Sequence, residues 1–202
     1  MKYYYSIKED VIIETKIKRS KFIVHLHYAE SVKDAKEYIS KISTEHKTAT
    51  HNCWAYIVGD RGETFHSSNA GEPPGTAGKP ILNTLKNHNM TNIVAIVTRY
   101  FGGVKLGIRG LIDAYSECIE NAVKKVFLKK LVKTSEFNVI TTYDFGEILK
   151  HKLKNMGATI SDIEYSDKVK LKIIIEDHKK AKLVLFLKEM ANLGKIKLAN
   201  KG

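Results

Sequence analysis

Hydrophobic and polar residues alternate along the first part of the chain in a way that predicts strands, and then change to a helical spacing. Val11–Ile17 and Lys21–His27 alternate with a period of two, which indicates two strands joined by a turn at Arg19 and Ser20. From Ser31 to about Glu45 the apolar residues recur at helical spacing, and Ser31 is a good N-cap. Further strands are expected at 52–58, 63–66 and 92–100, and helices from Pro80 and over about 111–128. The strand at 92–100 is almost continuously apolar, which predicts a central strand covered on both faces.

In the last third of the chain, short segments with strand-like and helix-like spacing of apolar residues follow one another closely. It predicts strand, helix, strand, strand, helix and strand at 137–143, 145–156, 158–165, 168–176, 178–192 and 195–199. This βαββαβ order is the split βαβ arrangement of ferredoxin-like domains. The sequence therefore predicts an α+β protein with two domains, residues 1–133 with a mixed sheet and residues 134–202 with a ferredoxin-like fold.

Two glycine-rich, polar loops stand out between these elements, at 66–80 and 99–110. Eight of the 13 glycines lie in or just before these loops, a density that lets the backbone take positive φ values and approach a ligand closely. The second loop joins an apolar strand to a helix, where exposed N–H groups favour an anion. The loops therefore predict a binding surface.

Basic side chains around the loops suggest an electropositive cleft. The candidate anion-binding or nucleic-acid-binding residues are Lys79, Arg99, Lys105, Arg109, Gly102, Gly103 and Gly107, with His51, Glu72 and Thr76 lining the cleft. The alternative for the glycines, equally compatible with the pattern, is a structural turn that allows tight helix–strand packing. For Glu72 we favour an ion pair with Arg99 or Lys105 over a role as general base.

Several specific chemistries do not fit. A P-loop fails because positions 73 and 80 are both proline, and the glycines at 102–110 lack dinucleotide-binding spacing. His51 and Cys53 share one face of a strand, but zinc would need two further ligands. A nucleophilic pair of Cys53 with a histidine is conceivable, although a buried cysteine usually acts as a small hydrophobe. We therefore expect no metal and no cofactor, and assign no catalytic residue.

The charge balance, +12 with a pI near 9.5, favours acidic partners such as RNA, ribosomes or phosphorylated ligands. A merely solvated lysine face is the alternative. It is the more common outcome for the lysines expected on one sheet face, at 168, 170, 172, 195 and 197. The chain has no apolar stretch of membrane-spanning length and no signal-peptide pattern, so we expect a cytoplasmic protein with reduced thiols and no membrane contact.

Four segments carry a resemblance to a known family: RSKFIVHL at 19–26, ATHNCWAYIVG at 49–59, GEPPGTAGKPIL at 71–82 and VTRYFGGVKLGIRGLIDAYS at 97–116. They strongly resemble the IMPACT/YigZ family over nearly all of residues 1–130, and the remainder looks like the small C-terminal domain of the bacterial members. The resemblance implies an N-terminal domain similar to the second domain of a small-subunit ribosomal protein. It also implies a C-terminal domain similar to a ferredoxin-like domain of elongation factor G. The eukaryotic relatives are translational regulators that act through protein–protein contact, whereas the bacterial members lack an established chemistry.

The chain departs from the family pattern at two places. The usual acidic pair before Gly-Glu-Pro is replaced by Asn69 and Ala70, and a glycine of the second loop is replaced by Arg109. Both changes make the local charge more positive, which fits anion binding better than catalysis.

The sequence thus predicts a translation-associated regulatory or binding protein rather than an enzyme. It would contact RNA, the ribosome or a translation factor through the basic glycine-rich cleft. One alternative is a hydrolase-like enzyme acting on a small phosphorylated or peptide-like substrate in that cleft, for which no set of nucleophile, base and orienting group can be assembled. Another is a regulator that binds only protein. The sequence leaves the choice between RNA and protein open, as well as the oligomeric state.

Overall fold

A computed structural model of the protein describes residues 3–199 and divides the chain into two compact units, with the break between Leu131 and Val132. Helices and strands occur in both units, as expected for an α+β protein. Within the described residues, every helix is too short or too polar to span a bilayer.

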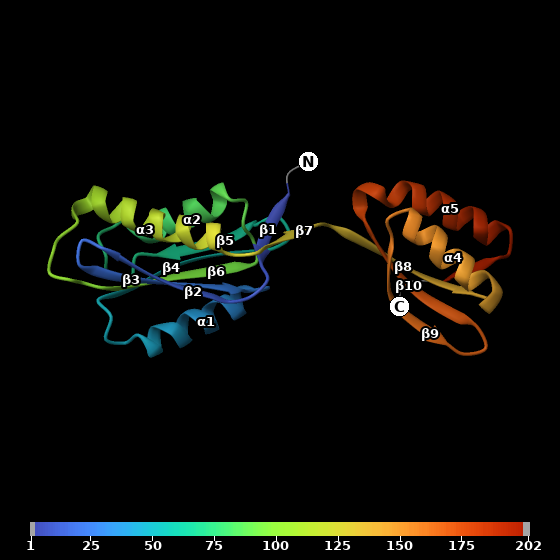
Figure 1. The fold of residues 1–202 in the computed structure, drawn as a ribbon, viewed down its shortest axis with the longest axis horizontal. Helices are drawn as coiled ribbons and strands as arrows, with labels where there is room; N and C mark the ends of the chain where they lie inside the picture. The colour runs from blue at the N-terminus through green and yellow to red at the C-terminus, as the bar shows by residue number, and fades with distance from the viewer. Residues whose placement is uncertain (1–2, 200–202) are drawn as a thin grey trace. The chain divides into compact units, whose positions relative to one another are not determined.

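The N-terminal unit is built on a five-stranded sheet (Figure 1). Its strands, in the order in which they pair, are β2 (Val11–Ile17), β3 (Ser20–Tyr28), β6 (Ile93–Tyr100), β4 (His51–Val58) and β5 (Thr64–Ser68). Every pairing is antiparallel, whereas the sequence led us to expect a mixed sheet. The reason is that β6 inserts between β3 and β4, so two strands that run in the same direction never become neighbours.

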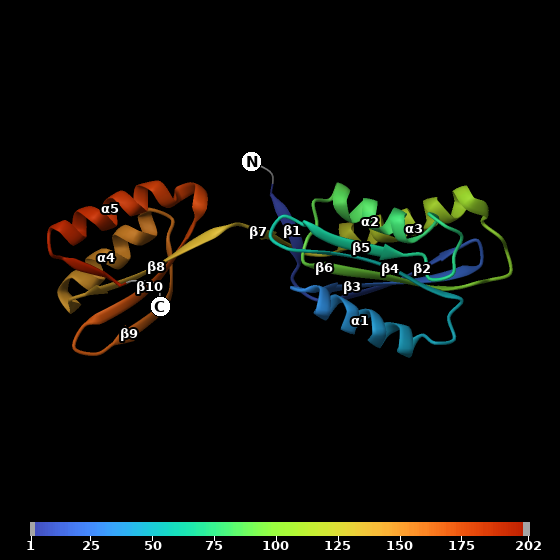
Figure 2. The same cartoon turned by 180° about the vertical axis from the view of Figure 1, so that it is seen from behind.

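Helices cover both faces of this sheet: α1 (Val32–Glu45) lies on one face, and α2 (Gly78–Asn87) and α3 (Gly107–Lys125) lie on the other (Figures 1 and 2). The central strand β6 divides its side chains accordingly. Ala95 and Val97 join the core beneath α2 and α3, while Val94 and Ile96 join the core beneath α1. This double burial explains the continuous apolar run of β6.

Two helices begin earlier than the pattern suggested. We expected α2 to open at Pro80, but it starts at Gly78, and α3 starts at Gly107 rather than near residue 111. Arg109 consequently belongs to the first turn of α3. In α1 the predicted cap is present, because the Ser31 hydroxyl accepts the backbone N–H of Asp34.

A further pair of strands closes the unit: β1 (Tyr4–Ile7) pairs with β7 (Leu128–Leu131) in an antiparallel ladder. Neither strand was predicted from the sequence. β7 is short and lies in a lysine-rich segment, so it lacks the apolar alternation that predicts a strand.

The C-terminal unit contains β8 (Thr134–Thr141), α4 (Tyr143–Asn155), β9 (Thr159–Tyr165), β10 (Val169–Glu176), a short 3-10 turn (Asp177–Lys179), α5 (Lys180–Asn192) and β11 (Ile196–Ala199). Its sheet has the order β11-β8-β10-β9 with antiparallel pairings throughout, and both helices lie on one face (Figure 1).

The exposed face of that sheet carries acidic as well as basic side chains. Lys170 pairs with Glu164 and Lys172 pairs with Glu136, while Lys168 lies before β10 rather than within it. The lysines of β10 are thus partly neutralised by their neighbours, which supports the solvated-face interpretation over a nucleic-acid surface.

Candidate functional site

A buried ion pair joins the two glycine-rich loops. Nη1 of Arg99, near the end of β6, lies 2.6 Å from Oε1 of Glu72, in the loop before α2. Both residues are buried beneath α3, at 5% and 7% exposure. This is one of the two pairings for Glu72 that the sequence favoured.

Other buried side chains complete the polar cluster. The Tyr115 hydroxyl of α3 donates to the same Oε1 of Glu72 at 2.9 Å, and Nη2 of Arg99 donates to the Ser20 hydroxyl at 3.4 Å. Cys53 Sγ lies 3.3 Å from the Tyr115 hydroxyl oxygen and 2.9 Å from the carbonyl oxygen of Asn69. Burial raises the pKa of Cys53 to about 12 and also raises the pKa of Tyr115. A thiol held neutral in this way is no nucleophile at physiological pH.

His51 lies at the edge of the cluster. Its Nδ1 donates to the carbonyl oxygen of Ala70 at 2.9 Å, and its Nε2 lies 3.9 Å from Oε2 of Glu72. Gly71, with φ at +90°, leaves room for the imidazole, because a Cβ there would lie 3.0 Å from Nδ1. Among the described residues, no three His, Cys, Asp or Glu side chains gather closely enough to hold a metal ion.

The first glycine-rich loop is ordered by its own polar groups. The Asn69 side-chain oxygen accepts the backbone N–H groups of Ala77 and Gly78, at 3.2 and 3.0 Å, and so caps the start of α2. Thr76, predicted to line a cleft, is buried, and its hydroxyl donates to the carbonyl oxygen of Pro73 at 2.8 Å.

The second glycine-rich loop packs its backbone against the turn between β2 and β3. A Cβ on Gly102 would lie 1.9 Å from the carbonyl oxygen of Arg19, so only glycine fits there. Gly103 and Gly107 differ in kind: both have positive φ values, +84° and +73°, and open space around them. The glycines therefore serve tight packing at one position and a left-handed backbone at the other two.

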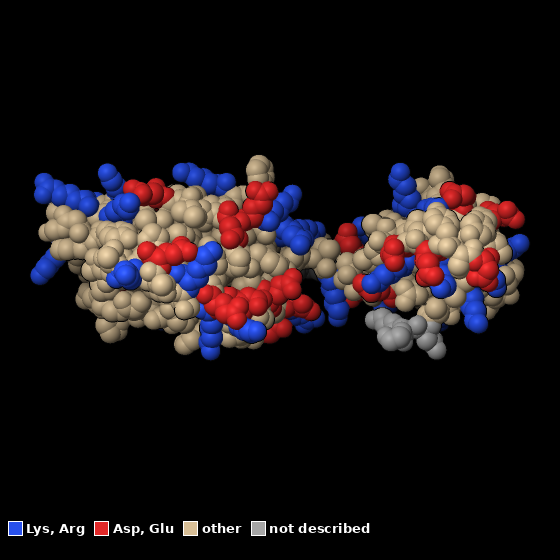
Figure 3. Space-filling model, turned by 90° about the horizontal axis from the view of Figure 1, so that it is seen from below, with Lys and Arg blue, Asp and Glu red and all other residues tan. Residues whose placement is uncertain are grey.

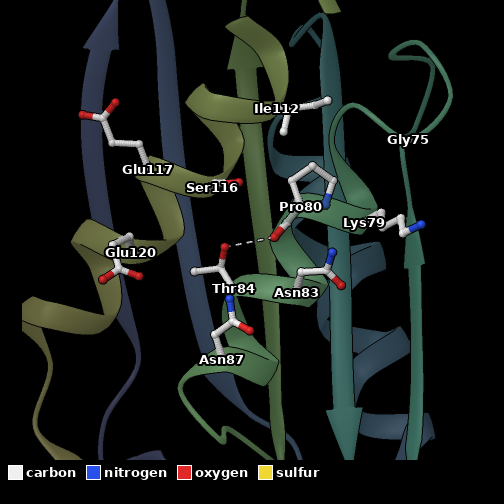
Figure 4. A pocket seen from close by; sticks show the side chains of 10 residues that line it. All are labelled: Gly75, Lys79, Pro80, Asn83, Thr84, Asn87, Ile112, Ser116, Glu117 and Glu120. Carbon is white, nitrogen blue, oxygen red and sulfur yellow. Dashed lines mark hydrogen bonds between the residues drawn. The ribbon is translucent and has the colours of Figure 1, made fainter. Parts of the chain in front are cut away.

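The four candidate cations lie in different environments. Lys79 and Lys105 are exposed, and Arg109 is 89% exposed with an ion pair to Asp113 at 3.2 Å. Arg99 is instead buried against Glu72, so its charge is compensated inside the protein. Lys79 lines a groove between α2 and α3 (Figure 4).

Two features at the surface were not identified from the sequence. Phe101 is 45% exposed beside the second loop, with the Arg99 guanidinium 5.5 Å from its ring centre. Figure 3 shows Lys and Arg side chains projecting at the end of the N-terminal unit where the β2–β3 turn and the β6–α3 loop lie in Figure 1. The exposed Arg19 belongs to that turn, and the contact of its backbone with Gly102 of the second loop becomes evident only from the fold.

Fold and site together define an α+β protein in which a helix-covered antiparallel sheet carries two glycine-rich loops joined by a buried ion pair. The family model of the Impact N-terminal domain matches residues 18–123. The chain is 34% identical to the IMPACT family member YvyE of Bacillus subtilis over 191 residues, which cover 94% of this chain and 87% of that protein. It is 30% identical to the IMPACT family member YigZ of Escherichia coli over 167 residues, 82% of each chain.

A solved structure, the crystal structure of a hypothetical protein, matches with a TM-score of 0.65 and 28% identity, covering 100% of this chain and 98% of that one. The chain belongs to the IMPACT family, as its motifs indicated.

Proposed function

We propose that the protein is a cytoplasmic regulator associated with translation that binds single-stranded RNA, free or as part of the ribosome, through the end of its N-terminal unit. Membership of the IMPACT family supports the link to translation. The RNA-binding part of the proposal rests on the surface formed by Arg19, Lys47, Phe101, Lys105 and Arg109, which we call the basic loop surface.

Three segments form this surface, and backbone packing and hydrogen bonds hold them together. The backbone of Gly102 packs directly on that of Arg19, and its N–H donates to the Ser20 hydroxyl. The N–H of Phe101 donates to Thr50 Oγ1 at 2.9 Å, which ties the loop to the segment after α1 that contains Lys47.

The observation that carries the proposal is an exposed aromatic ring among cations. Single-stranded nucleic acids bind to surfaces that combine positive charge with aromatic side chains, because every base offers a face for stacking. Phe101 supplies such a ring, and Lys105 and Arg109 flank the start of α3, whose first turn has no acidic residue and no side-chain cap. The free N–H groups of that turn add to the attraction for a phosphate.

We propose a ferredoxin-like fold for the C-terminal domain, residues 134–202, and a fold similar to the second domain of a small-subunit ribosomal protein for residues 1–133. The βαββαβ order and the strand order β11-β8-β10-β9 support the former.

The salt dependence of RNA binding tests the function. With a fluorescent single-stranded RNA and the full chain, three phosphate contacts should give a slope of log K against log salt of about −2. In the double variant Lys105→Ala/Arg109→Ala the magnitude of this slope should be smaller by about 1.4. Phe101→Ala should weaken binding by about 1–3 kcal/mol and leave the slope unchanged, since stacking releases no counterions.

A matched control removes the same charge elsewhere. Lys182→Ala/Lys188→Ala replaces two exposed lysines of α5 and should leave the slope as it is in the unsubstituted protein. Equal effects of both double variants would mean that the attraction reflects net charge alone. Absence of RNA binding by the unsubstituted protein would refute the proposal and favour a protein partner.

A further inference from the structure

A groove of about 720 Å³ runs between α2 and α3 on the outer side of the N-terminal unit (Figure 4). Lys79 and Ile112 line it near the start of the two helices, and Asn87 and Glu120 line it farther along. Nε2 of His88 lies 2.7 Å from Oε2 of Glu120, which joins the helices beyond this second end. The helices therefore run in the same direction along the two walls.

Each wall presents three side chains at a spacing of four residues. They are Lys79, Asn83 and Asn87 on α2, and Ile112, Ser116 and Glu120 on α3. Since a helix rises 1.5 Å per residue, neighbouring members of a row are about 6 Å apart and each row is about 12 Å long.

This spacing matches an extended polypeptide, in which two residues span about 6.6 Å. A carboxamide both donates and accepts hydrogen bonds, so it can bind the C=O and the N–H of one backbone residue. The side chains of Asn83 and Asn87 are exposed, and their amides have no hydrogen-bond partner among residues 3–199. The two amides can thus bind alternate residues of one extended segment, about four residues of which fit along the groove.

The floor of the groove is less polar than its rim. The Thr84 hydroxyl donates to the carbonyl oxygen of Pro80 at 3.0 Å, so it is already satisfied (Figure 4). The Pro80 ring at the floor and Ile112 on the α3 wall offer apolar contact to a backbone bound at the rim.

The two sides of the groove carry unpaired charges of opposite sign. Lys79, near the start of α2, has no ion-pair partner in the described part of the chain. Glu120, at the other end, is already paired with His88 and Lys124, but Glu117, beside Ser116 along α3, has no such partner within residues 3–199 (Figure 4). The groove therefore suits a segment with an acidic side chain directed towards Lys79 on the α2 side and a basic one directed towards Glu117 on the α3 side. The two glutamates disfavour a nucleic acid.

We propose that this groove binds an extended peptide segment of a partner protein, with the amides of Asn83 and Asn87 on the peptide backbone and Glu117 on a basic side chain. This site is separate from the basic loop surface. It would give the protein a second binding activity whether or not RNA is the ligand of the first.

The test uses the full chain and fluorescein-labelled peptides with the central sequence Asp-Ala-Val-Lys or its reverse, because the direction of binding is not fixed by the two amides. One of the two orders should bind. Asn83→Ala/Asn87→Ala should weaken that binding about tenfold or more, because the hydrogen bonds of both amides to the peptide backbone are lost. Glu117→Gln should abolish the preference for lysine over acetyl-lysine in the peptide.

Two controls keep the outcome interpretable. Asn155→Ala/Asn192→Ala removes two exposed amides from the C-terminal unit and should leave peptide affinity unchanged. Lys105→Ala/Arg109→Ala should also leave it unchanged, which separates this site from the basic loop surface. Failure of both peptides to bind at millimolar concentration, or unaltered affinity in Asn83→Ala/Asn87→Ala, would overturn the proposal.

Discussion

The guanidinium of Arg99 lies 2.6 Å from the carboxylate of Glu72, and their side chains are only 6% and 3% exposed. The two residues belong to different glycine-rich loops, so the contact fixes one loop against the other beneath α3. Removing one member of a buried ion pair leaves an uncompensated charge in the interior, which typically costs about 3–5 kcal/mol.

We therefore expect Arg99→Met to lower the free energy of unfolding of the N-terminal unit by about 3–5 kcal/mol. Urea denaturation followed by fluorescence measures this, because the only tryptophan, Trp54, lies in β4. The double variant Arg99→Met/Glu72→Met should be less destabilised than Arg99→Met, since no charge is left unpaired. A loss below about 1 kcal/mol in Arg99→Met would contradict a buried pair.

A second buried group predicts a pH dependence. Both ring nitrogens of His25 lack a hydrogen-bond partner within residues 3–199, and the side chain packs against His46 at 5.2 Å between ring centres. Burial, followed by the nearby His46, lowers the pKa of His25 to about 4, while Glu45 acts in the opposite direction.

In the unfolded chain the His25 imidazole is protonated below about pH 6.5, whereas in the folded protein it is protonated only below about pH 4. Above pH 6.5 the imidazole is neutral in both states, so the folded protein has its full stability there. This stability should fall by about 2–3 kcal/mol between pH 6.5 and pH 4. We expect His25→Leu to lose this part of the pH dependence and to remain close to the unsubstituted protein in stability at pH 7. Parallel urea denaturation series from pH 4 to 7 test this, and identical pH profiles for the two proteins would count against it.

Much of the fold could be predicted because local patterns determined it. The period of the apolar residues gave the strands β2, β3 and β6, and the cap at Ser31 gave the start of α1. The prediction of a mixed sheet was wrong because the position of β6 between β3 and β4 depends on contacts between residues that are far apart in the sequence.

The candidate site was predicted less well, for the same physical reason. The charge of Arg99 is visible in the sequence, but its burial depends on α3 and on a carboxylate 27 residues away. The side chains that line the α2–α3 groove have a regular spacing in the sequence. That they form the two walls of one groove can be recognised only once the two helices are known to lie side by side.

Asn69 gives a prediction about the start of α2. Its side-chain oxygen accepts two backbone N–H groups there, so Asn69→Ala should lower the free energy of unfolding of the N-terminal unit by about 1 kcal/mol. Asn69→Asp should retain the stability, because a carboxylate accepts the same bonds and interacts favourably with the helix dipole. Thermal unfolding of the three proteins provides the comparison, and equal losses in the two variants would show that the cap contributes little.

The contact between Gly102 and Arg19 predicts a difference between two adjacent glycines. At Gly102 an added Cβ would lie 1.9 Å from the carbonyl oxygen of Arg19, and the loop is held there by the bond from the Gly102 N–H to Ser20 Oγ. Gly102→Ala must therefore displace the loop, at an expected cost of about 2–4 kcal/mol. Gly103 has open space but a φ of +84°, so Gly103→Ala should cost only about 1–2 kcal/mol.

Because Phe101 and Lys105 flank these glycines, displacement of the loop should also weaken RNA binding in Gly102→Ala more than in Gly103→Ala. Urea denaturation followed by Trp54 fluorescence measures the first difference, and titration with the labelled RNA measures the second. If Gly102→Ala were as stable as Gly103→Ala and bound RNA equally well, the two loop segments would not form one packed surface. The basic loop surface would then lose its structural basis.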